Sequence, residues 1–247
     1  MSHPALPEPA RGVFSTLLVV DGRPRELDRH LARLRASLAA LYGADLPAGV
    51  AETAVATARP HAVARLRVAV VPAAGGGPLG VTVSATEIER ALVLPGGERA
   101  LTLRSAAVEG WRGAHKWIDR RALEALDAAA APAGALLVDR ASGAALETTR
   151  ASLFAVGADG VVRTPPADGT ILPGVCRALA LELAPALGVE VREQRLPAAG
   201  LAAARELFTT GSVRGVEPVA ALDGHRFDAP GPIAAALTDA LRRRWFD

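Results

Sequence analysis

The chain begins with a strand, a tight turn and a second short strand, followed directly by the apolar spacing of a helix. The segment 13–27, VFSTLLVVDGRPREL, predicts two strands joined at Asp21-Gly22, a pair typical of two-residue hairpin turns. Asp28 is predicted to cap a helix that runs to Gly43, with apolar residues at steps of three and four: Leu31, Leu34, Leu38 and Leu41. Because such a helix must bury its apolar stripe against another element, this opening favours an α/β fold.

The same alternation continues along the rest of the chain. Further predicted elements up to residue 107 are a helix at about 48–58 and strands at 65–72, 79–86 and 100–106, which complete an N-terminal α/β domain. The turn-rich segment 108–116 is predicted to connect two domains. In 117–247 we expect a helix at 119–130, hairpins through Ser142-Gly143 and Asp159-Gly160, and a helix after Gly174 that ends at Gly188. They are followed by a strand at 189–196, a short helix at 201–206, two strands within 207–224 and a terminal helix. The sequence therefore predicts a two-domain protein of mixed α/β class.

Composition excludes several other classes of protein. The chain has 247 residues, of which 50% are apolar and 22% charged, so it can form a sizeable folded core. The net charge is only +2, the arginines are dispersed and aromatic residues make up 4%, which disfavours nucleic-acid binding. With Cys176 as the single cysteine and no HExxH spacing, we expect neither a disulfide nor a metal site. We found no apolar run long enough for a membrane span and no signal-peptide core, and therefore expect a cytoplasmic protein.

Lysine usage provides the first indication of chemistry. Lys and Arg together number 28, yet Lys116 is the single lysine and asparagine is absent. GC-rich coding accounts for the general excess of arginine over lysine, but not for the one exception. A lysine can lose its proton and act as a nucleophilic amine, whereas an arginine stays protonated. Lys116 is therefore a candidate for covalent catalysis.

Four other features are ordinary when each is taken alone. The segment ILPGVCR places Gly174 at the start of a helix, where backbone N–H groups can bind an anion. The segment TTGS (209–212) is a hydroxyl-rich loop that follows a strand. Arg33 and Glu147 would usually be solvent-exposed charges. Their order along the chain, taken together with Lys116, indicates that they belong to one functional site.

In that order the sequence resembles the class IV pyridoxal-phosphate enzymes. This family includes branched-chain and D-amino acid aminotransferases and aminodeoxychorismate lyase, an enzyme of folate biosynthesis. The resemblance covers most of the chain, with Lys116 followed 31 residues later by Glu147, and it is carried by GVFSTLLVVDG, HLARL, LETTRASLF, TPPADGTILPGVCR and LFTTGSVRGVEPVAALDG. It implies two domains with pyridoxal 5'-phosphate at their interface, and a homodimer.

The resemblance also implies a role for each matching residue. Lys116 matches the lysine that binds the cofactor aldehyde and then transfers protons, and Glu147 matches the carboxylate beside the pyridine nitrogen. Arg33 matches the arginine that pairs with the cofactor phosphate. Further positions of the same cofactor site are the backbone N–H groups of Val175 and Cys176, the hydroxyl of Ser212 and the apolar side chain of Leu172.

Several positions bear on the substrate, which we expect to be a small amino compound. Ser15 and Thr16 stand where many aminotransferases have a glutamate, and this hydroxyl pair is similar to the lyases; strand alternation points only one of the two into the site. Pro72 stands where D-amino acid aminotransferases and several lyases carry a carboxylate-binding arginine, and Arg67 or Arg65 could replace it. The backbone of Val213 is the remaining candidate for contact with the substrate.

The hydroxyl pair favours 4-amino-4-deoxychorismate lyase, with Thr16 as an additional catalytic residue, whereas Pro72 only disfavours D-amino acids. The segment WIDRR after Lys116 lacks the tyrosine of branched-chain aminotransferases and agrees with this choice. A branched-chain or D-amino acid aminotransferase is the alternative. A non-catalytic binding module and an arginine-rich nucleic-acid binder are remote alternatives, because the cofactor positions are filled and no basic block is present.

Overall fold

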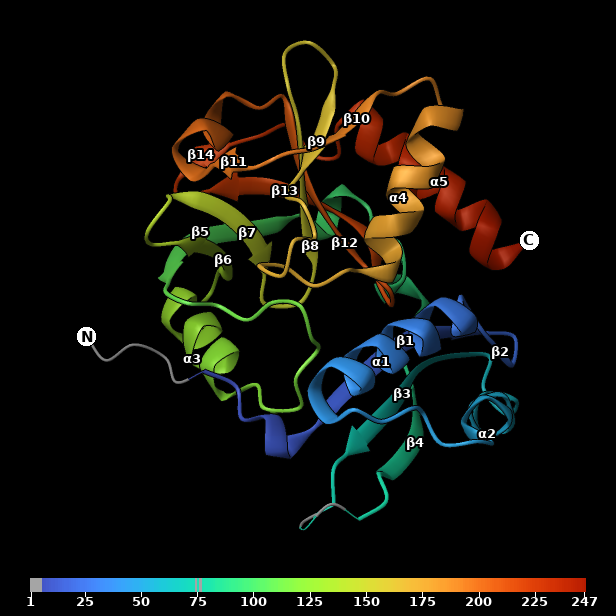
Figure 1. Ribbon diagram of the computed structural model, residues 1–247. Coiled ribbons are helices and arrows are strands. Elements are labelled where there is room, and N and C mark those ends of the chain that lie inside the picture. The colour runs from blue at the N-terminus through green and yellow to red at the C-terminus, as the bar shows by residue number, and fades with distance from the viewer. Residues whose placement is uncertain (1–5, 74, 76) are drawn as a thin grey trace.

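A computed structural model describes residues 6–73, 75 and 77–247. The described chain forms a small sheet with two helices and a larger sheet with three (Figure 1). The small sheet has the order β2-β1-β3-β4, with β1 at Val13–Val20, β2 at Arg23–Pro24, β3 at Val63–Val71 and β4 at Gly80–Glu87. Helices α1 (Leu27–Tyr42) and α2 (Val50–Ala58) cover one of its faces. These elements confirm the opening hairpin and the two helices that the sequence predicted.

The start of α1 differs in detail from the prediction. The helix begins one residue before Asp28, after Glu26 in the left-handed region at φ 56°, and no side chain caps it. Asp28 instead lies in the first turn, where its negative charge interacts favourably with the helix dipole. The helix ends at Gly43, whose φ of 59° is the left-handed conformation that glycine adopts readily.

The large sheet has ten strands in the order β10-β9-β8-β12-β13-β5-β6-β7-β11, with β14 paired to β13. Their bounds are β5 Leu101–Val108, β6 Gly134–Asp139, β7 Ala144–Thr148, β8 Ser152–Val156, β9 Val162–Thr164, β10 Val191–Glu193, β11 Leu196–Pro197, β12 Glu206–Gly211, β13 Gly215–Leu222 and β14 His225–Arg226. An additional pairing of Glu147 on β7 with Ser152 on β8 closes six of these strands into a ring. The interior of the ring is apolar, with Leu103, Leu136, Leu153, Leu207 and Val219 in one buried cluster. Glu147 therefore lies where the ring closes.

Three helices accompany this sheet. Helices α4 (Val175–Ala186) and α5 (Pro232–Phe246) pack on one face, in a core that also contains Phe154 and Phe208, whose rings stack 5.0 Å apart. Helix α3 (Arg121–Ala130) packs beside β5 and β6. Leu18 and Val20 of β1 belong to the same core as α4 and α5, so the small sheet packs directly against the large unit. Among the described residues, no helix has the length and apolarity to cross a membrane.

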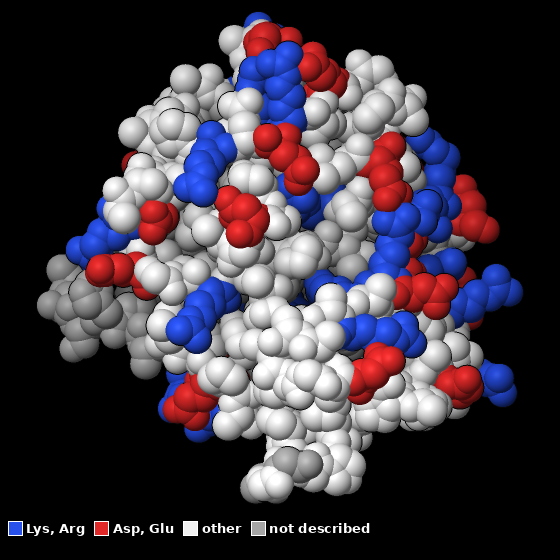
Figure 2. Space-filling view, viewed as in Figure 1, with Lys and Arg blue, Asp and Glu red and all other residues white. Residues whose placement is uncertain are grey.

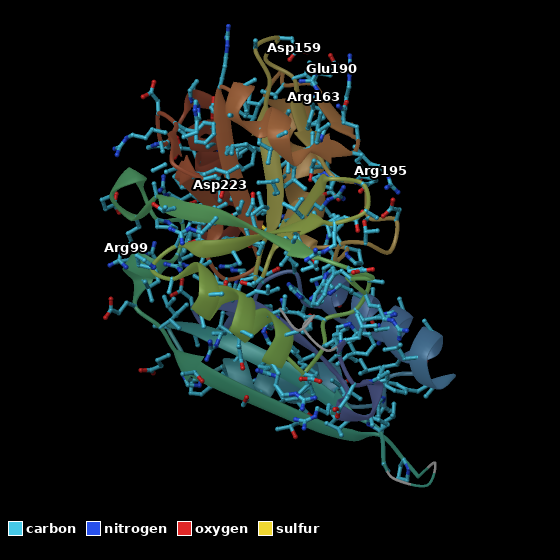
Figure 3. The ribbon with its side chains drawn as sticks, turned by 90° about the vertical axis from the view of Figure 1, so that its left-hand side faces the viewer. Arg99, Asp159, Arg163, Glu190, Arg195 and Asp223 are labelled. Carbon is cyan, nitrogen blue, oxygen red and sulfur yellow. The ribbon has the colours of Figure 1, made fainter. Side chains whose placement is uncertain are left out.

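The hairpins predicted in the second half of the chain are confirmed. Strands β6 and β7 are antiparallel through Ser142-Gly143, and β8 and β9 through Asp159-Gly160. Asp159 and Arg163 form an ion pair of 2.6 Å at the end of the second hairpin (Figure 3). Acidic and basic side chains alternate over the face shown in Figure 2, in agreement with the dispersed charge of the sequence.

Three boundaries differ from the prediction. Strand β5 pairs with β6 and β13, so it belongs to the large sheet and not to an N-terminal unit that extends to residue 107. The single strand predicted at 189–196 is two short strands, because β10 pairs with β9 while β11 pairs with β7. The helix predicted at 201–206 is a 3₁₀ helix at Ala198–Ala203, and Glu206 begins β12.

Candidate active site

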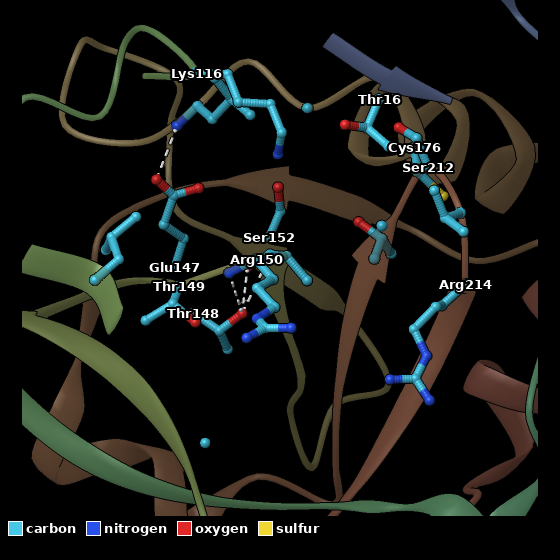
Figure 4. A pocket seen from close by; sticks show the side chains of 18 of the residues that line it. Thr16, Lys116, Glu147, Thr148, Thr149, Arg150, Ser152, Cys176, Ser212 and Arg214 are labelled. Atoms are coloured by element: carbon cyan, nitrogen blue, oxygen red, sulfur yellow. Dashed lines mark hydrogen bonds between the residues drawn. The ribbon is translucent and has the colours of Figure 1, made fainter. Parts of the chain in front are cut away.

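A cavity of about 710 Å³ lies where the small sheet meets the large one. Its wall combines β1 and β3, the segment around Lys116, the β7–β8 turn, the start of α4 and the β12–β13 turn. Figure 4 shows Lys116 and Glu147 on one side of it and Thr16, Cys176 and Ser212 on the other. Elements that are distant in sequence thus contribute to one site.

Lys116 is held by the start of strand β1. The N–H of Phe14 donates to the Lys116 carbonyl at 2.8 Å, and the N–H of Ile118 donates to the Gly12 carbonyl at 3.0 Å. The next residue, Trp117, is 4% exposed and packs in the core beneath the small sheet. The lysine backbone is therefore attached to the N-terminal unit, although the sequence places it after that unit.

The amine of Lys116 is in an environment that favours its neutral form. Burial lowers its pKa to about 7, and the positive charges of Arg33 and Arg120 act in the same direction. The Nζ atom lies 5.2 Å from the centre of the Phe14 ring. A lysine with this pKa is partly deprotonated at neutral pH, as a nucleophile or general base requires.

Glu147 provides a buried carboxyl group on the same side of the cavity as Lys116. It lies on β7, is 8% exposed, and its Oε1 accepts a hydrogen bond of 3.2 Å from the N–H of Leu172. Burial raises its pKa to about 7, opposed by that hydrogen bond and by the charge of Lys116. A carboxyl group with this pKa can share a proton with a ring nitrogen.

The other end of the cavity has the features of an anion site. Arg33 from α1 lines the cavity together with Gly174, Cys176 and Ser212. Helix α4 begins directly after Gly174, so its unpaired N–H groups and dipole favour a negative charge there. A Cβ added at Gly174 would lie 2.8 Å from Ser152 Oγ, which accounts for glycine at this position. The buried Thr210 Oγ1, also on the cavity wall, has no hydrogen-bond partner among the described residues.

These groups fit pyridoxal 5'-phosphate. The anion site has the cation, hydroxyl and N–H donors that a phosphate group needs, with the unpartnered Thr210 Oγ1 beside them. Lys116 presents an amine for an aldehyde, and Glu147 presents a carboxyl group for a pyridine nitrogen. Leu172 lines the same cavity and could pack on a ring.

Strand alternation separates the two hydroxyl residues of β1. Thr16 lines the cavity, whereas Ser15 is fully buried against α1, where it contacts His30 and Arg33. The expectation that Ser15 contacts a substrate is therefore corrected, because successive side chains of a strand point to opposite faces. Thr16 remains the candidate for a hydroxyl residue of β1 that contacts the substrate.

The neighbouring strand places two arginines on the cavity side. Arg65 and Arg67 both line the cavity, while Pro72 follows the end of β3 and lies outside the wall. The guanidinium carbon of Arg67 lies 3.9 Å from the centre of the Phe14 ring, the same ring that Lys116 approaches. Neither arginine forms an ion pair within the described ranges.

The remaining predicted residues differ in what they present to the cavity. Val213 lines it beside Ser212, whereas the Val175 side chain is buried behind the start of α4. The thiol of Cys176 is 1% exposed, and burial raises its pKa to about 12. Such a thiol is not a nucleophile at neutral pH.

Sequence reasoning missed further charged residues of the wall. Arg120, Arg150 and Arg214 follow Lys116, Glu147 and Ser212 by two to four residues, and this proximity is the signal that could have found them. The Arg120 side chain donates to the Thr149 carbonyl at 2.6 Å. Among the described lining residues, seven are basic and three acidic: Arg33, Arg65, Arg67, Lys116, Arg120, Arg150 and Arg214 against Asp127, Glu147 and Glu217. The cavity is therefore strongly cationic.

Comparison with known proteins gives a family match. Residues 12–222 match a family model described as amino-transferase class IV. The branched-chain-amino-acid aminotransferase of Escherichia coli K12 is 41% identical over 85 residues. That alignment covers 34% of this chain and 28% of the relative.

Solved structures share the fold over nearly the whole chain. A hypothetical aminotransferase from Mycobacterium tuberculosis, in a form with α-ketoglutarate and PMP bound, superposes with a TM-score of 0.83 at 22% identity, covering 95% of this chain and 89% of that one. The branched-chain amino acid aminotransferase of Escherichia coli gives 0.80 at 23% identity, with coverages of 94% and 84%. A Legionella pneumophila protein proposed to be a 4-amino-4-deoxychorismate lyase gives 0.80 at 20% identity, with coverages of 99% and 96%.

Proposed function

This chain belongs to the class IV aminotransferase family, whose members are pyridoxal-phosphate-dependent enzymes, and from that premise we propose that it is a 4-amino-4-deoxychorismate lyase. The reaction would convert its substrate into 4-aminobenzoate and pyruvate. The observation that carries the proposal is the pair Arg65 and Arg67 beside Thr16, in a cavity with an excess of basic side chains.

The cofactor would be held by the residues that line the two ends of the cavity. Lys116 would bind its aldehyde carbon and Glu147 would contact its ring nitrogen. Its phosphate would take hydrogen bonds from Arg33, Ser212 and the N–H groups at the start of α4. When bound, pyridoxal phosphate supplies an acceptor for the electron pair that remains after a proton is removed from the substrate.

The cationic wall favours a substrate with more than one carboxylate. 4-Amino-4-deoxychorismate carries one carboxylate on its ring and one on its enolpyruvyl group, whereas a branched-chain amino acid carries one carboxylate and an apolar side chain. Arg65 and Arg67 are the basic residues of β3 that no acidic neighbour neutralises within the described ranges. A guanidinium group binds a carboxylate through two parallel hydrogen bonds, which gives orientation as well as affinity.

Lys116 and Thr16 would carry the proton transfers. The neutral amine of Lys116, favoured by a pKa of about 7, would remove the proton from the ring carbon that bears the amino group. The carbon–oxygen bond to the enolpyruvyl group would then break as the ring becomes aromatic. The Thr16 hydroxyl would donate a hydrogen bond to the departing oxygen, which would take up the proton that Lys116 removed, and the resulting enol would tautomerise to pyruvate. The Val213 N–H is proposed to contact a substrate carboxylate.

A class IV aminotransferase is the second candidate. It is favoured by the name of the Escherichia coli relative, which matches about a third of this chain. The same Lys116 and Glu147 would serve, and the arginine pair would bind the distal carboxylate of a dicarboxylic amino acid. The difference between the two reactions lies in the fate of the substrate proton and in the need for a keto acid acceptor.

A product assay distinguishes these two candidates. Purified holoenzyme is incubated with 4-amino-4-deoxychorismate alone, and separately with leucine, isoleucine or D-alanine plus 2-oxoglutarate. We expect 4-aminobenzoate and pyruvate in equal amounts, without a keto acid. Turnover of an amino acid without turnover of 4-amino-4-deoxychorismate would establish the aminotransferase instead.

Two variants test whether Arg67 binds a carboxylate of the substrate. Arg67→Ala should raise KM for the dianionic substrate about tenfold, as expected for loss of a charge-assisted hydrogen bond. Arg35→Ala is the matched control, since this arginine is 51% exposed on α1 and does not line the cavity. Equal KM values for the two variants would remove the support that Arg67 gives to a dicarboxylate substrate.

We also propose that the enzyme is a cytoplasmic homodimer that divides into an N-terminal and a C-terminal domain. The proposal rests on the family resemblance, and light scattering of the purified protein gives the mass that tests the dimer.

A further inference from the structure

Ser15 is buried in a short chain of hydrogen bonds behind the cavity. Its side chain is 0% exposed, and its Oγ lies 2.8 Å from His30 Nδ1 and 2.8 Å from Arg33 Nη2. His30 is itself 1% exposed and belongs to α1, one turn before Arg33. A strand residue and two residues of the helix that covers the strand are thus joined through one hydroxyl.

The chemistry of the three side chains fixes the direction of these bonds. Arginine has only donors, so Ser15 Oγ accepts from Arg33. The hydroxyl proton of Ser15 then needs an acceptor, and Nδ1 of a neutral histidine provides it. This arrangement gives the Ser15 hydroxyl both a donor and an acceptor, whereas a donor at Nδ1 would leave a buried hydroxyl proton without a partner. Burial and the charges of Arg33 and Lys116 lower the pKa of His30 well below its usual value, in agreement with a neutral ring.

We infer that Ser15 and His30 are positioning residues that hold the Arg33 guanidinium in the orientation that binds the cofactor phosphate. The inference rests on the role proposed above for Arg33, and it reassigns Ser15 from the substrate to the anion site. Arg33 enters the cavity from a helix, and a long side chain loses conformational entropy when it is fixed there. One Nη group held by Ser15 restricts the guanidinium plane before any ligand arrives, while the remaining N–H groups stay available to an oxyanion.

The location of His30 supports this assignment. His30 borders a narrow crevice together with Val175, Cys176 and Ser212, which surround the start of α4. The hydrogen-bond chain therefore extends from Arg33 to the rear of the proposed phosphate site. Burying three polar side chains in succession costs free energy unless each finds a partner. Apolar residues would fill the core without that cost, so these three side chains indicate a role beyond packing.

The test measures pyridoxal phosphate affinity of the apoprotein by absorbance titration, together with the melting temperature of each apoprotein. Ser15→Ala should raise Kd for pyridoxal phosphate about tenfold, and Ser15→Thr, which keeps the hydroxyl, should stay within about threefold of wild type. The control is Thr164→Val, which removes another fully buried hydroxyl, one that donates to the Leu153 carbonyl at 2.7 Å outside the cavity. It should lower the melting temperature without changing Kd.

A double-mutant cycle separates positioning from general destabilisation. If Ser15 acts through Arg33, then Ser15→Ala should have no further effect on Kd in an Arg33→Ala background. His30→Asn, which keeps an acceptor near the position of Nδ1, should bind pyridoxal phosphate more tightly than His30→Leu.

The inference is overturned if Ser15→Ala binds pyridoxal phosphate as wild type does, or if its effect is the same with and without Arg33. Failure of the wild-type protein to bind pyridoxal phosphate would instead overturn the cofactor site, and failure with 4-amino-4-deoxychorismate would overturn only the lyase. The three outcomes are therefore distinguishable.

Discussion

Replacing Lys116 with methionine is expected to stabilise the cofactor-free protein. Folding places the amine in surroundings that lower its pKa from 10.5 to about 7. Between these two pH values the unfolded chain holds a proton on Lys116 that the folded chain does not, so the contribution of Lys116 to stability rises with pH across this window. The destabilising effect of Lys116 is therefore complete below pH 7 and disappears by about pH 10.5.

The shift in pKa sets the upper limit of the effect. A difference of about 3.5 pKa units corresponds to roughly 5 kcal/mol at pH 7. The amine borders the cavity rather than the closed core, and it attracts Glu147, so we expect Lys116→Met to gain about 1–3 kcal/mol. A methionine keeps the length of the chain and packs well beside the ring of Phe14.

Urea denaturation of the apoproteins at pH 7 and pH 9.5 measures this difference. The advantage of Lys116→Met should fall by more than half at the higher pH. The reason is that pH 9.5 lies close to the unfolded pKa of 10.5, so binding a proton there stabilises the unfolded chain much less than at pH 7. Lys116→Arg is the control, since it keeps the charge in the same place and should not be more stable than wild type. A methionine variant that is no more stable at pH 7, or whose advantage is independent of pH, would refute the argument that burial lowers the pKa of this amine.

Three further predictions concern the cofactor and its neighbours. Borohydride reduction of the holoprotein should attach the pyridoxyl group to Lys116 and to no other residue, as peptide mapping by mass spectrometry would show. Arg33→Ala should raise Kd for pyridoxal phosphate by one to two orders of magnitude, whereas Cys176→Ala should change it by less than threefold because the backbone N–H is the proposed donor. Glu147→Gln should stabilise the apoprotein at pH 8 by about 1–2 kcal/mol and have no effect near pH 4.5, since a pKa raised from 4.5 to about 7 destabilises the fold only where the carboxyl must ionise, and urea denaturation at the two pH values checks this.

The sequence predicted local elements well where the pattern and the turn residues agreed. The Asp21-Gly22 hairpin is one example, since both residues adopt positive φ, of 49° and 72°. It predicted less well where an element depends on partners distant in the chain. Strand β5 has the same local pattern whether it pairs in the small sheet or the large one, and only β13 and β6 decide between them. Nothing in the sequence indicates that Glu147 and Ser152 close a ring of strands.

The same distinction holds for the site. Lys116, Glu147 and Arg33 could be identified because each lies in a short segment that resembles the family, and the structure places all three around one cavity. The direction of Ser15 could not be decided from its pattern, because a strand with apolar residues on both faces has no alternation to read. Arg150 was missed for a different reason: a single exposed arginine in a turn carries no periodic signal.

The location of Lys116 shows how the two units share one reaction site. Its backbone pairs with the start of β1, and Trp117 anchors it in the N-terminal core, while Glu147 belongs to the large sheet. The distance between amine and carboxyl group is therefore set by how the two units pack, and that packing depends on residues of β1 that face the large unit, such as Leu18.

Leu18→Ala should create a cavity at this contact and weaken cofactor binding without altering any residue of the site, because a buried leucine contributes roughly 2–5 kcal/mol. The matched variant is Leu38→Ala, in the core beneath the small sheet, which should cost similar stability and leave Kd for pyridoxal phosphate close to that of wild type. Equal loss of affinity in both variants would show that the contact between the units does not set the geometry of the site.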